Sequence, residues 1–462
     1  MTTLLPSSTT FRSPAPVLAG LFTIIVACLL QHRIGITDVD AENYLLGARS
    51  LALGQGYVDD FGIPLNHWPP GYSLLLSWWP DPKFGALVIN MACLGLAVAQ
   101  TLVLASRMGW GRAHSLALSL ALGFGLYLSI AQFSKPDILG YVVFLAAILS
   151  YSGGTFKGRV LGCVLCSLLI PFKLIAVTFA PGILLAELIH FGPRPFFKTR
   201  WREVMIAGLA WGICLGGLLW YNALTLKTAT PDSYAAASLH SVLAEVVRFF
   251  SDLFRSGLAF WYGSIRASSV ITPFTIVAVL GLACLLSLRR SNGWSLTFKR
   301  GVAILAFCWG LEFYRIYFAN PRLMGYGMIL MLIGMQPLPK STPLWCAYAA
   351  ATVALAIDNH VSVNSLGLNH PVYESSAIEA AAHLPPNATV YSNSYRLLDI
   401  HAHRRSIPVS SLNGLPPGAW YWHADLPNYD AIMRPINPLP ARDDSWQEQA
   451  RLSGGILFRK SQ

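Results

Sequence analysis

Charged residues are scarce in this chain of 462 residues. Lys, Arg, Asp and Glu make up 12% of the sequence, whereas a soluble domain carries about 25%. Hydrophobic residues make up 54%, and apolar runs close to membrane-spanning length recur between Val17 and Ile357. The deficit of charge argues against a soluble protein and predicts a polytopic α-helical membrane protein.

Cysteine is missing from every region predicted to lie outside the membrane. All eight cysteines fall inside apolar segments, so no disulfide framework is expected. Cys163 and Cys166 form a single C-x-x-C within a predicted helix, without the second ligand pair of a metal site. No cleavable signal peptide is expected either, because only Arg12 precedes the first apolar run and no small-residue cleavage site follows it.

Acidic residues are fewer than basic ones, and the formal net charge is +11. Many of the cations lie in short loops between apolar segments, around 107–112, 157–159, 194–202 and 289–300. The positive-inside rule explains such loops, so they should share the cytoplasmic side, and nucleic acid is not expected as a partner.

About eleven spans are predicted from the apolar runs. They cover 16–31, 84–105, 114–131, 137–151, 159–172, 174–190, 204–221, 269–288, 301–318, 323–338 and 343–357. Residues 1–357 then form a transmembrane domain, and 358–462 form a small extracytoplasmic α/β domain. A helix over Glu374–His383 and short strands at Thr389–Tyr391, Ser406–Val409 and Ile456–Arg459 are expected there.

The segment 38–76 is rich in acids and follows the first predicted span. Apolar spacing from Tyr44 to Ala52 predicts a short amphipathic helix on the membrane surface, with Gly54 as its stop. Asp38, Asp40 and Glu42 crowd its N-terminus. Capping a helix, worth about 0.5–2 kcal/mol, needs only one acid, so capping and a functional role both remain open.

Three short motifs follow one another in this segment: Asp40-x-x-x-Tyr44, Gly54-x-Gly56-Tyr57 and Pro69-Pro70-Gly71-Tyr72. Their order resembles the GT-C superfamily of membrane glycosyltransferases. The sequence is most similar to the branch with the aminoarabinose and galacturonic-acid lipid A transferases and the protein O-mannosyltransferases. The resemblance implies a GT-C-like fold with an acidic first external loop and an outer C-terminal domain.

The resemblance also implies an activity, the transfer of a sugar from a polyprenyl-phosphate donor to an extracytoplasmic lipid or glycan acceptor with inversion. Asp40 matches the proposed catalytic base, which removes a proton from the acceptor hydroxyl. Asp38 or Glu42 would assist, and Tyr44 and Tyr57 are expected at the substrate. The site would lie outside the cytoplasm, in a bacterial inner or plasma membrane.

The leaving polyprenyl phosphate departs as an anion and needs cations. Lys135, Lys173 and Arg322 lie at predicted external helix ends. Snorkelling is the alternative for Lys135. Lys173 interrupts an apolar run, which costs about 2.5–3.5 kcal/mol at mid-depth, so a function and a structural role are both open. Arg322 resembles the family's Arg-Tyr element, although Tyr326 stands four residues further on.

The metal requirement is left open by the sequence. The aminoarabinose transferases carry Glu-Lys before the proline where this chain has His67-Trp68. The sequence assigns no cofactor and leaves the presence of a divalent metal open. His67 either binds a metal or the acceptor, or is structural.

Three other functions predict different features of the sequence. A transporter or flippase without transferase activity predicts related halves and broken helices, and no internal repeat is visible. A structural or assembly protein would not require the acids around Asp40. A polysaccharide ligase or polymerase would more typically place its largest active loop late in the chain.

Overall fold

The computed structural model describes residues 14–30, 39–59, 68–126, 134–225, 296–316, 321–334, 371–386, 388–393, 397–402, 406–409, 414–424 and 445–461, with single positions 62, 64, 65, 131, 404 and 412. Contacts divide the chain into two compact units. The helical unit comprises residues 1–32 and 86–359, and the mixed unit comprises 33–85 and 360–462. The first loop therefore belongs to the same unit as the C-terminal residues. The helical unit ends at residue 359, two residues beyond the predicted end of the transmembrane domain at 357.

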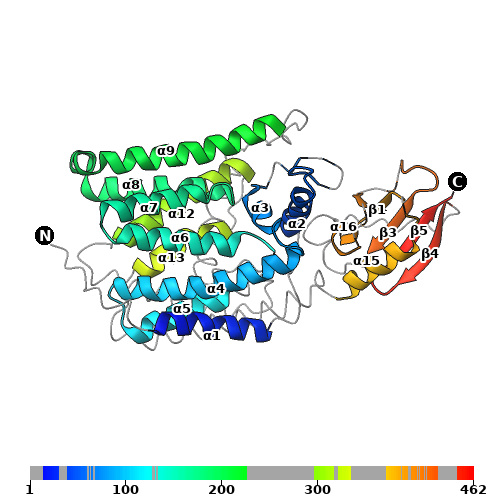
Figure 1. Ribbon diagram of the computed structural model, residues 1–462, viewed down its shortest axis with the longest axis horizontal. Coiled ribbons are helices and arrows are strands. Elements are labelled where there is room, and N and C mark those ends of the chain that lie inside the picture. The colour runs from blue at the N-terminus through cyan, green and yellow to red at the C-terminus, as the bar shows by residue number, and fades with distance from the viewer. Residues whose placement is uncertain are drawn as a thin grey trace, which may run out of the picture. The chain divides into compact units, whose positions relative to one another are not determined.

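Helices of the helical unit run side by side (Figure 1). They are α1 (Ala15–Leu30), α4 (Pro82–Arg107), α5 (Arg112–Leu126), α6 (Asp137–Ser152), α7 (Phe156–Leu168), the 3-10 helix η3 (Leu174–Thr178), α8 (Phe179–Phe191), α9 (Pro193–Thr225), α12 (Leu296–Ile316) and α13 (Pro321–Gly334). Three described stretches are long and apolar enough to cross a membrane: Pro82–Arg107, Leu174–Phe191 and Pro193–Tyr221.

Every predicted span within the described residues overlaps one of these helices. The largest difference is α9, which begins at Pro193, eleven residues before the predicted start at 204, because its first turns are basic and escape a search for apolar runs. The predicted spans 269–288 and 343–357 lie outside the described residues.

Helices α6 and α13 cross at a stacked pair of tyrosines. The rings of Tyr141 and Tyr326 lie 4.2 Å apart between centroids and are nearly parallel. Glycine permits this approach, since a methyl group at Gly140 would overlap the Tyr326 hydroxyl and one at Gly325 would overlap the Tyr141 hydroxyl. The hydroxyl of Tyr326 also lies 3.4 Å from the carbonyl oxygen of Asp137. The starts of α6 and α13 therefore share one end of the helical unit.

The mixed unit combines a five-stranded sheet with short helices. Its helices are α2 (Val39–Ala52), α3 (Gly71–Leu76), α15 (Pro371–His383) and α16 (Leu397–Ala402). The strands are β1 (Val390–Ser392), β2 (Ser406–Pro408), β3 (Trp420–Ala424), β4 (Trp446–Leu452) and β5 (Gly455–Lys460), in the order β2-β1-β3-β5-β4. Strand β1 pairs in parallel with β2 and β3, and β5 pairs antiparallel with β3 and β4.

Small residues of α15 cover the centre of the sheet. Ala377 and Ala380 pack with Val390, Trp422 and Leu457 in one apolar cluster. The predicted helix and strands at 374–383, 389–391, 406–409 and 456–459 correspond to α15, β1, β2 and β5. Strands β3 and β4 were not predicted. Strand β4 is a polar edge strand with mostly exposed side chains, so it lacks the apolar signal of a buried strand.

Helix α2 is tied to α16 within the mixed unit. Arg49 Nη1 donates a hydrogen bond to the carbonyl oxygen of Asp399 at 3.1 Å. The carboxylate of Asp399 in turn accepts from Ser406 N at 3.0 Å and from Ser406 Oγ at 2.6 Å. These bonds connect the helix that carries Asp40 to the edge strand β2.

Candidate functional site

Asp40 is held in place at the beginning of α2. It is the second residue of the helix and is partly exposed. Trp68 Nε1 donates a hydrogen bond to Asp40 Oδ1 at 3.1 Å. A carboxylate in the first turn also interacts favourably with the positive end of the helix dipole. The indole and the helix therefore fix the carboxylate while leaving part of the side chain accessible.

A cluster of hydroxyl and aromatic side chains fixes α2 against α3. Ser73 Oγ donates to the carbonyl oxygen of Tyr44 at 2.8 Å and lies 3.5 Å from the Tyr57 hydroxyl. The rings of Tyr44 and Tyr72 meet edge to face at 5.6 Å. The ring of Tyr57 lies against Gly47, where a methyl group would overlap it.

The residues that were predicted for this site differ in how much of each side chain is exposed. Tyr44, Tyr57 and Glu42 are each at most 5% exposed, whereas Asp40 is partly open. Helix α2 is buried along most of its length and not on one face alone, so the predicted surface amphipathic pattern is wrong. Its end agrees with the prediction, because Gly54 has φ +70° and its N–H bonds to the carbonyl oxygen of Leu51 at 3.0 Å. Asp38 and His67 lie outside the described residues.

Two predicted phosphate-binding lysines lie near each other at one end of the helical unit, which we call the lysine end. Lys135 is 5% exposed and stands two residues before Asp137, where α6 begins. Lys173 forms an ion pair with Asp137, with only 11% and 2% of the two side chains exposed. The pairing of Lys173 with Asp137 was missed from the sequence, because the two residues are 36 positions apart.

Lys173 lies in the turn between α7 and α8 and not inside one continuous span. Helix α13 also begins at the lysine end, since Tyr326 contacts the start of α6. Arg322 is the second residue of α13, and its side chain lies outside the described residues. The structure thus brings Lys135, Lys173 and the start of α13 together.

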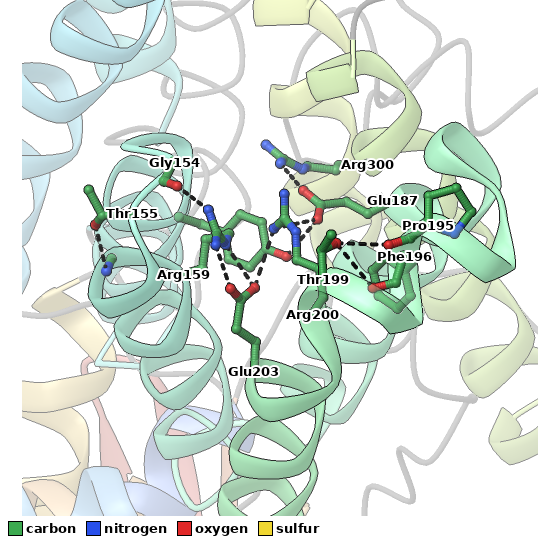
Figure 2. A network of polar contacts seen from close by, with 12 residues as sticks. Gly154, Thr155, Arg159, Glu187, Pro195, Phe196, Thr199, Arg200, Glu203 and Arg300 are labelled. Atoms are coloured by element: carbon green, nitrogen blue, oxygen red, sulfur yellow. Dashed lines mark hydrogen bonds and ion pairs between the residues drawn. The ribbon is translucent and has the colours of Figure 1, made fainter.

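The opposite end of the helical unit, the basic end, holds a buried ion network (Figure 2). Glu203 lies between Arg159 and Arg200, and Glu187 lies between Arg200 and Arg300. Tyr151 adds a hydrogen bond to Glu187 Oε2 at 3.0 Å. The two acids come from α8 and α9, and the three arginines come from α7, α9 and α12.

Further contacts show that the basic loops gather at this end. Arg107 Nη1 donates to the carbonyl oxygen of Leu149 at 3.1 Å, which joins the end of α4 to the end of α6. Trp110 Nε1 donates to the carbonyl oxygen of Ile333 at 2.8 Å, which adds the end of α13. The described loops that the positive-inside rule assigned to one side therefore do share one end.

No metal site is formed by the described side chains. Within them, no group of three or more His, Cys, Asp and Glu residues is arranged to hold an ion. Cys163 and Cys166 are both buried in α7. His67, the residue considered for a metal, is not among the positions that the structure describes.

Comparison with known proteins finds similarity among solved structures. No protein-family model matches the chain, and no curated protein matches it. Among solved structures, the chain is similar to ArnT from Cupriavidus metallidurans in the apo state, with 14% identity, a TM-score of 0.47 and 98% of each chain covered. These values are too low to transfer an activity, so the proposed function rests on this chain's own residues.

Proposed function

We propose that this chain is a GT-C-like integral membrane glycosyltransferase. It takes a sugar from a polyprenyl-phosphate donor and passes it to a lipid or glycan acceptor on the extracytoplasmic face. The observation that carries the proposal is Asp40, a partly exposed carboxylate in the first turn of α2 that accepts a hydrogen bond from Trp68 at 3.1 Å. A held but accessible carboxylate suits a general base.

The reaction is a single inverting displacement. The acceptor oxygen attacks the anomeric carbon from the face opposite the phosphate, and its proton passes to Asp40. The new carbon–oxygen bond forms while the bond from the anomeric carbon to the phosphate oxygen breaks, and that electron pair leaves with the polyprenyl phosphate. Glu42, one of the two proposed assisting acids, is 4% exposed, which argues against its direct contact with the acceptor.

Cations stabilise the departing phosphate in this scheme. Lys135, Lys173 and Arg322 supply them at the lysine end. The starts of α6 and α13 add the partial positive charge of two helix N-termini. Asp137 neutralises part of this charge and fixes Lys173 through their ion pair. Tyr44 and Tyr57 are buried, which supports a role in shaping the loop around Asp40.

Lipid and glycan profiling of a deletion strain tests the function. We expect one envelope sugar to disappear, to return with the wild-type gene, and to stay absent with Asp40→Asn. Asp81→Asn is the matched control, because Asp81 is an exposed acid of the mixed unit that lies outside the 38–76 segment, and it should restore the sugar. An unchanged profile in the deletion strain, or full restoration by Asp40→Asn, contradicts the proposal.

A further inference from the structure

A stripe of exposed cations runs along the first turns of α9. Arg194, Lys198 and Arg202 are all exposed and follow one another at four-residue spacing. Residues four apart lie on the same face of a helix. The opposite face carries Phe196 and Glu203, which are buried. The stripe therefore points away from the helices that pack on α9.

The acids nearest to this stripe in the sequence are already paired. Between Asp137 and Asp232 the sequence contains only two acids, Glu187 and Glu203. Both are buried, and both are bound by arginines of the ion network. The network itself contains Arg159, Arg200 and Arg300 for the two carboxylates, as Figure 2 shows. Within residues 138–225, which the structure describes throughout, every acid is thus paired with an arginine of the network.

Aromatic and then aliphatic side chains continue from the stripe along α9. Phe197 and Trp201 are 49% and 54% exposed, and the guanidinium of Arg202 lies 5.4 Å from the Trp201 ring. Met205, Leu209 and Ile213 follow at the same four-residue spacing and are each about two-thirds exposed, at 65%, 66% and 65%. Along α9, cations are thus followed by aromatic rings and then by aliphatic side chains. The same order of groups is found from the surface of a membrane to its interior.

We propose that α9 binds an anionic phospholipid. The phosphate of the headgroup contacts Arg194, Lys198 and Arg202, the glycerol region lies beside Phe197 and Trp201, and the acyl chains lie along the aliphatic residues that follow. Charge complementarity favours an anionic lipid over a second copy of the chain as the partner of this stripe. A second copy would bring an identical cationic stripe to the same depth and would be repelled. The site is separate from the proposed catalytic residues.

Native mass spectrometry of the full-length protein tests the site, with phosphatidylglycerol and phosphatidylcholine of the same acyl chains as probes. We expect wild-type protein to retain phosphatidylglycerol preferentially. K198Q/R202Q should bind it about tenfold more weakly, because each surface cation contributes appreciably to the binding of anionic lipid. The preference should also weaken at high salt, since exposed charges are screened.

R112Q/K157Q is the matched control. It removes two exposed cations from the same end of the helical unit but not from α9. We expect this variant to retain phosphatidylglycerol like wild type, with unchanged thermal stability in all three proteins. An equal loss of phosphatidylglycerol binding in both variants would show that the binding depends on the general charge of the basic end, and would overturn the proposal. Equal retention of the two lipids by wild type, or a change of oligomeric state in K198Q/R202Q, would also overturn it.

Discussion

A general base in a membrane enzyme must be both held and reachable, and Asp40 meets both conditions. Its neighbour Glu42, two residues on in α2, is only 4% exposed. Asp40 is partly exposed and is oriented by the indole of Trp68. The difference arises because α2 is buried from Ala41 to Ala48, whereas Asp40 precedes this buried stretch. The acids of the loop are therefore not equivalent, although they look so in the sequence.

Replacing Trp68 by Phe tests the orientation of Asp40. The variant keeps an aromatic ring but loses the N–H that donates to Asp40. Since a hydrogen bond to a charged group contributes about 1.5–3 kcal/mol, we expect sugar transfer to slow by at least about tenfold. The measurement is the initial rate with purified protein. Trp78→Phe is the control, because Trp78 is 78% exposed, and it should keep the wild-type rate.

At the residue scale, the sequence predicts what depends on near neighbours. The helix that carries Asp40, and its end at Gly54, follow from spacing within one short segment. The partner of Asp40 does not, because Trp68 is 28 positions away and the chain must fold back to bring it there. The position of Trp68 directly before the Pro69-Pro70-Gly71-Tyr72 motif was the available signal.

At the scale of elements, the crossing of α6 and α13 brings the starts of these two helices together at the lysine end. The crossing depends on glycines that let the two tyrosine rings stack. We expect Gly140→Ala to destabilise the protein by about 1–3 kcal/mol, as overpacking does. Thermal unfolding in detergent measures the effect. Gly208→Ala in α9 should cause no loss, because a methyl group there meets no atom within 4 Å.

The ion network at the basic end fixes α7, α8, α9 and α12 to one another. Glu187→Gln removes the buried carboxylate that pairs with Arg300, while Arg200 keeps its ion pair with Glu203. Removing one partner of a buried ion pair costs about 3–5 kcal/mol, so we expect a lower unfolding temperature and faster proteolysis. Glu448→Gln should change neither, since that carboxylate is exposed on β4 and pairs with exposed Arg451. An unchanged unfolding temperature in Glu187→Gln would show that the network does not hold the helices.

Elements with a long apolar run were predictable, and elements without one were not. Helices α4, α6 and α8 follow their apolar runs closely, whereas the basic first turns of α9 and the polar strand β4 were missed. Ion pairs between segments far apart in the sequence were also missed, as for Lys173 with Asp137 and Arg159 with Glu203. Their partners are 36 and 44 positions apart, and their contact depends on the packing of whole helices.

At the scale of the whole molecule, charge is sorted between the two ends of the helical unit. The positive-inside rule predicted which of the described loops share an end, because that rule depends only on the sign of the charges and their position in the sequence. The grouping of the first loop with the C-terminal residues was not predicted. It depends on contacts such as the one between Arg49 and Asp399, 350 positions apart.

Labelling of single cysteines tests the orientation in the membrane. A thiol reagent that cannot cross the membrane should reach Cys at positions 55 and 449 from outside, because Gln55 and Gln449 are exposed in the mixed unit. It should reach positions 112 and 157 only after the membrane is opened, because these cations belong to the basic end. Labelling of positions 112 and 157 in intact cells would reverse the orientation and refute the extracytoplasmic site.

The most direct measurement of the central claim is the rate of sugar transfer by purified Asp40→Asn protein. The substrates are the polyprenyl-phosphate sugar and the acceptor that the deletion strain identifies. We expect turnover to fall by at least about a hundredfold, because general-base catalysis contributes about 10²–10⁴-fold, while the protein stays folded and inserted. Turnover near the wild-type rate would show that Asp40 is not the base.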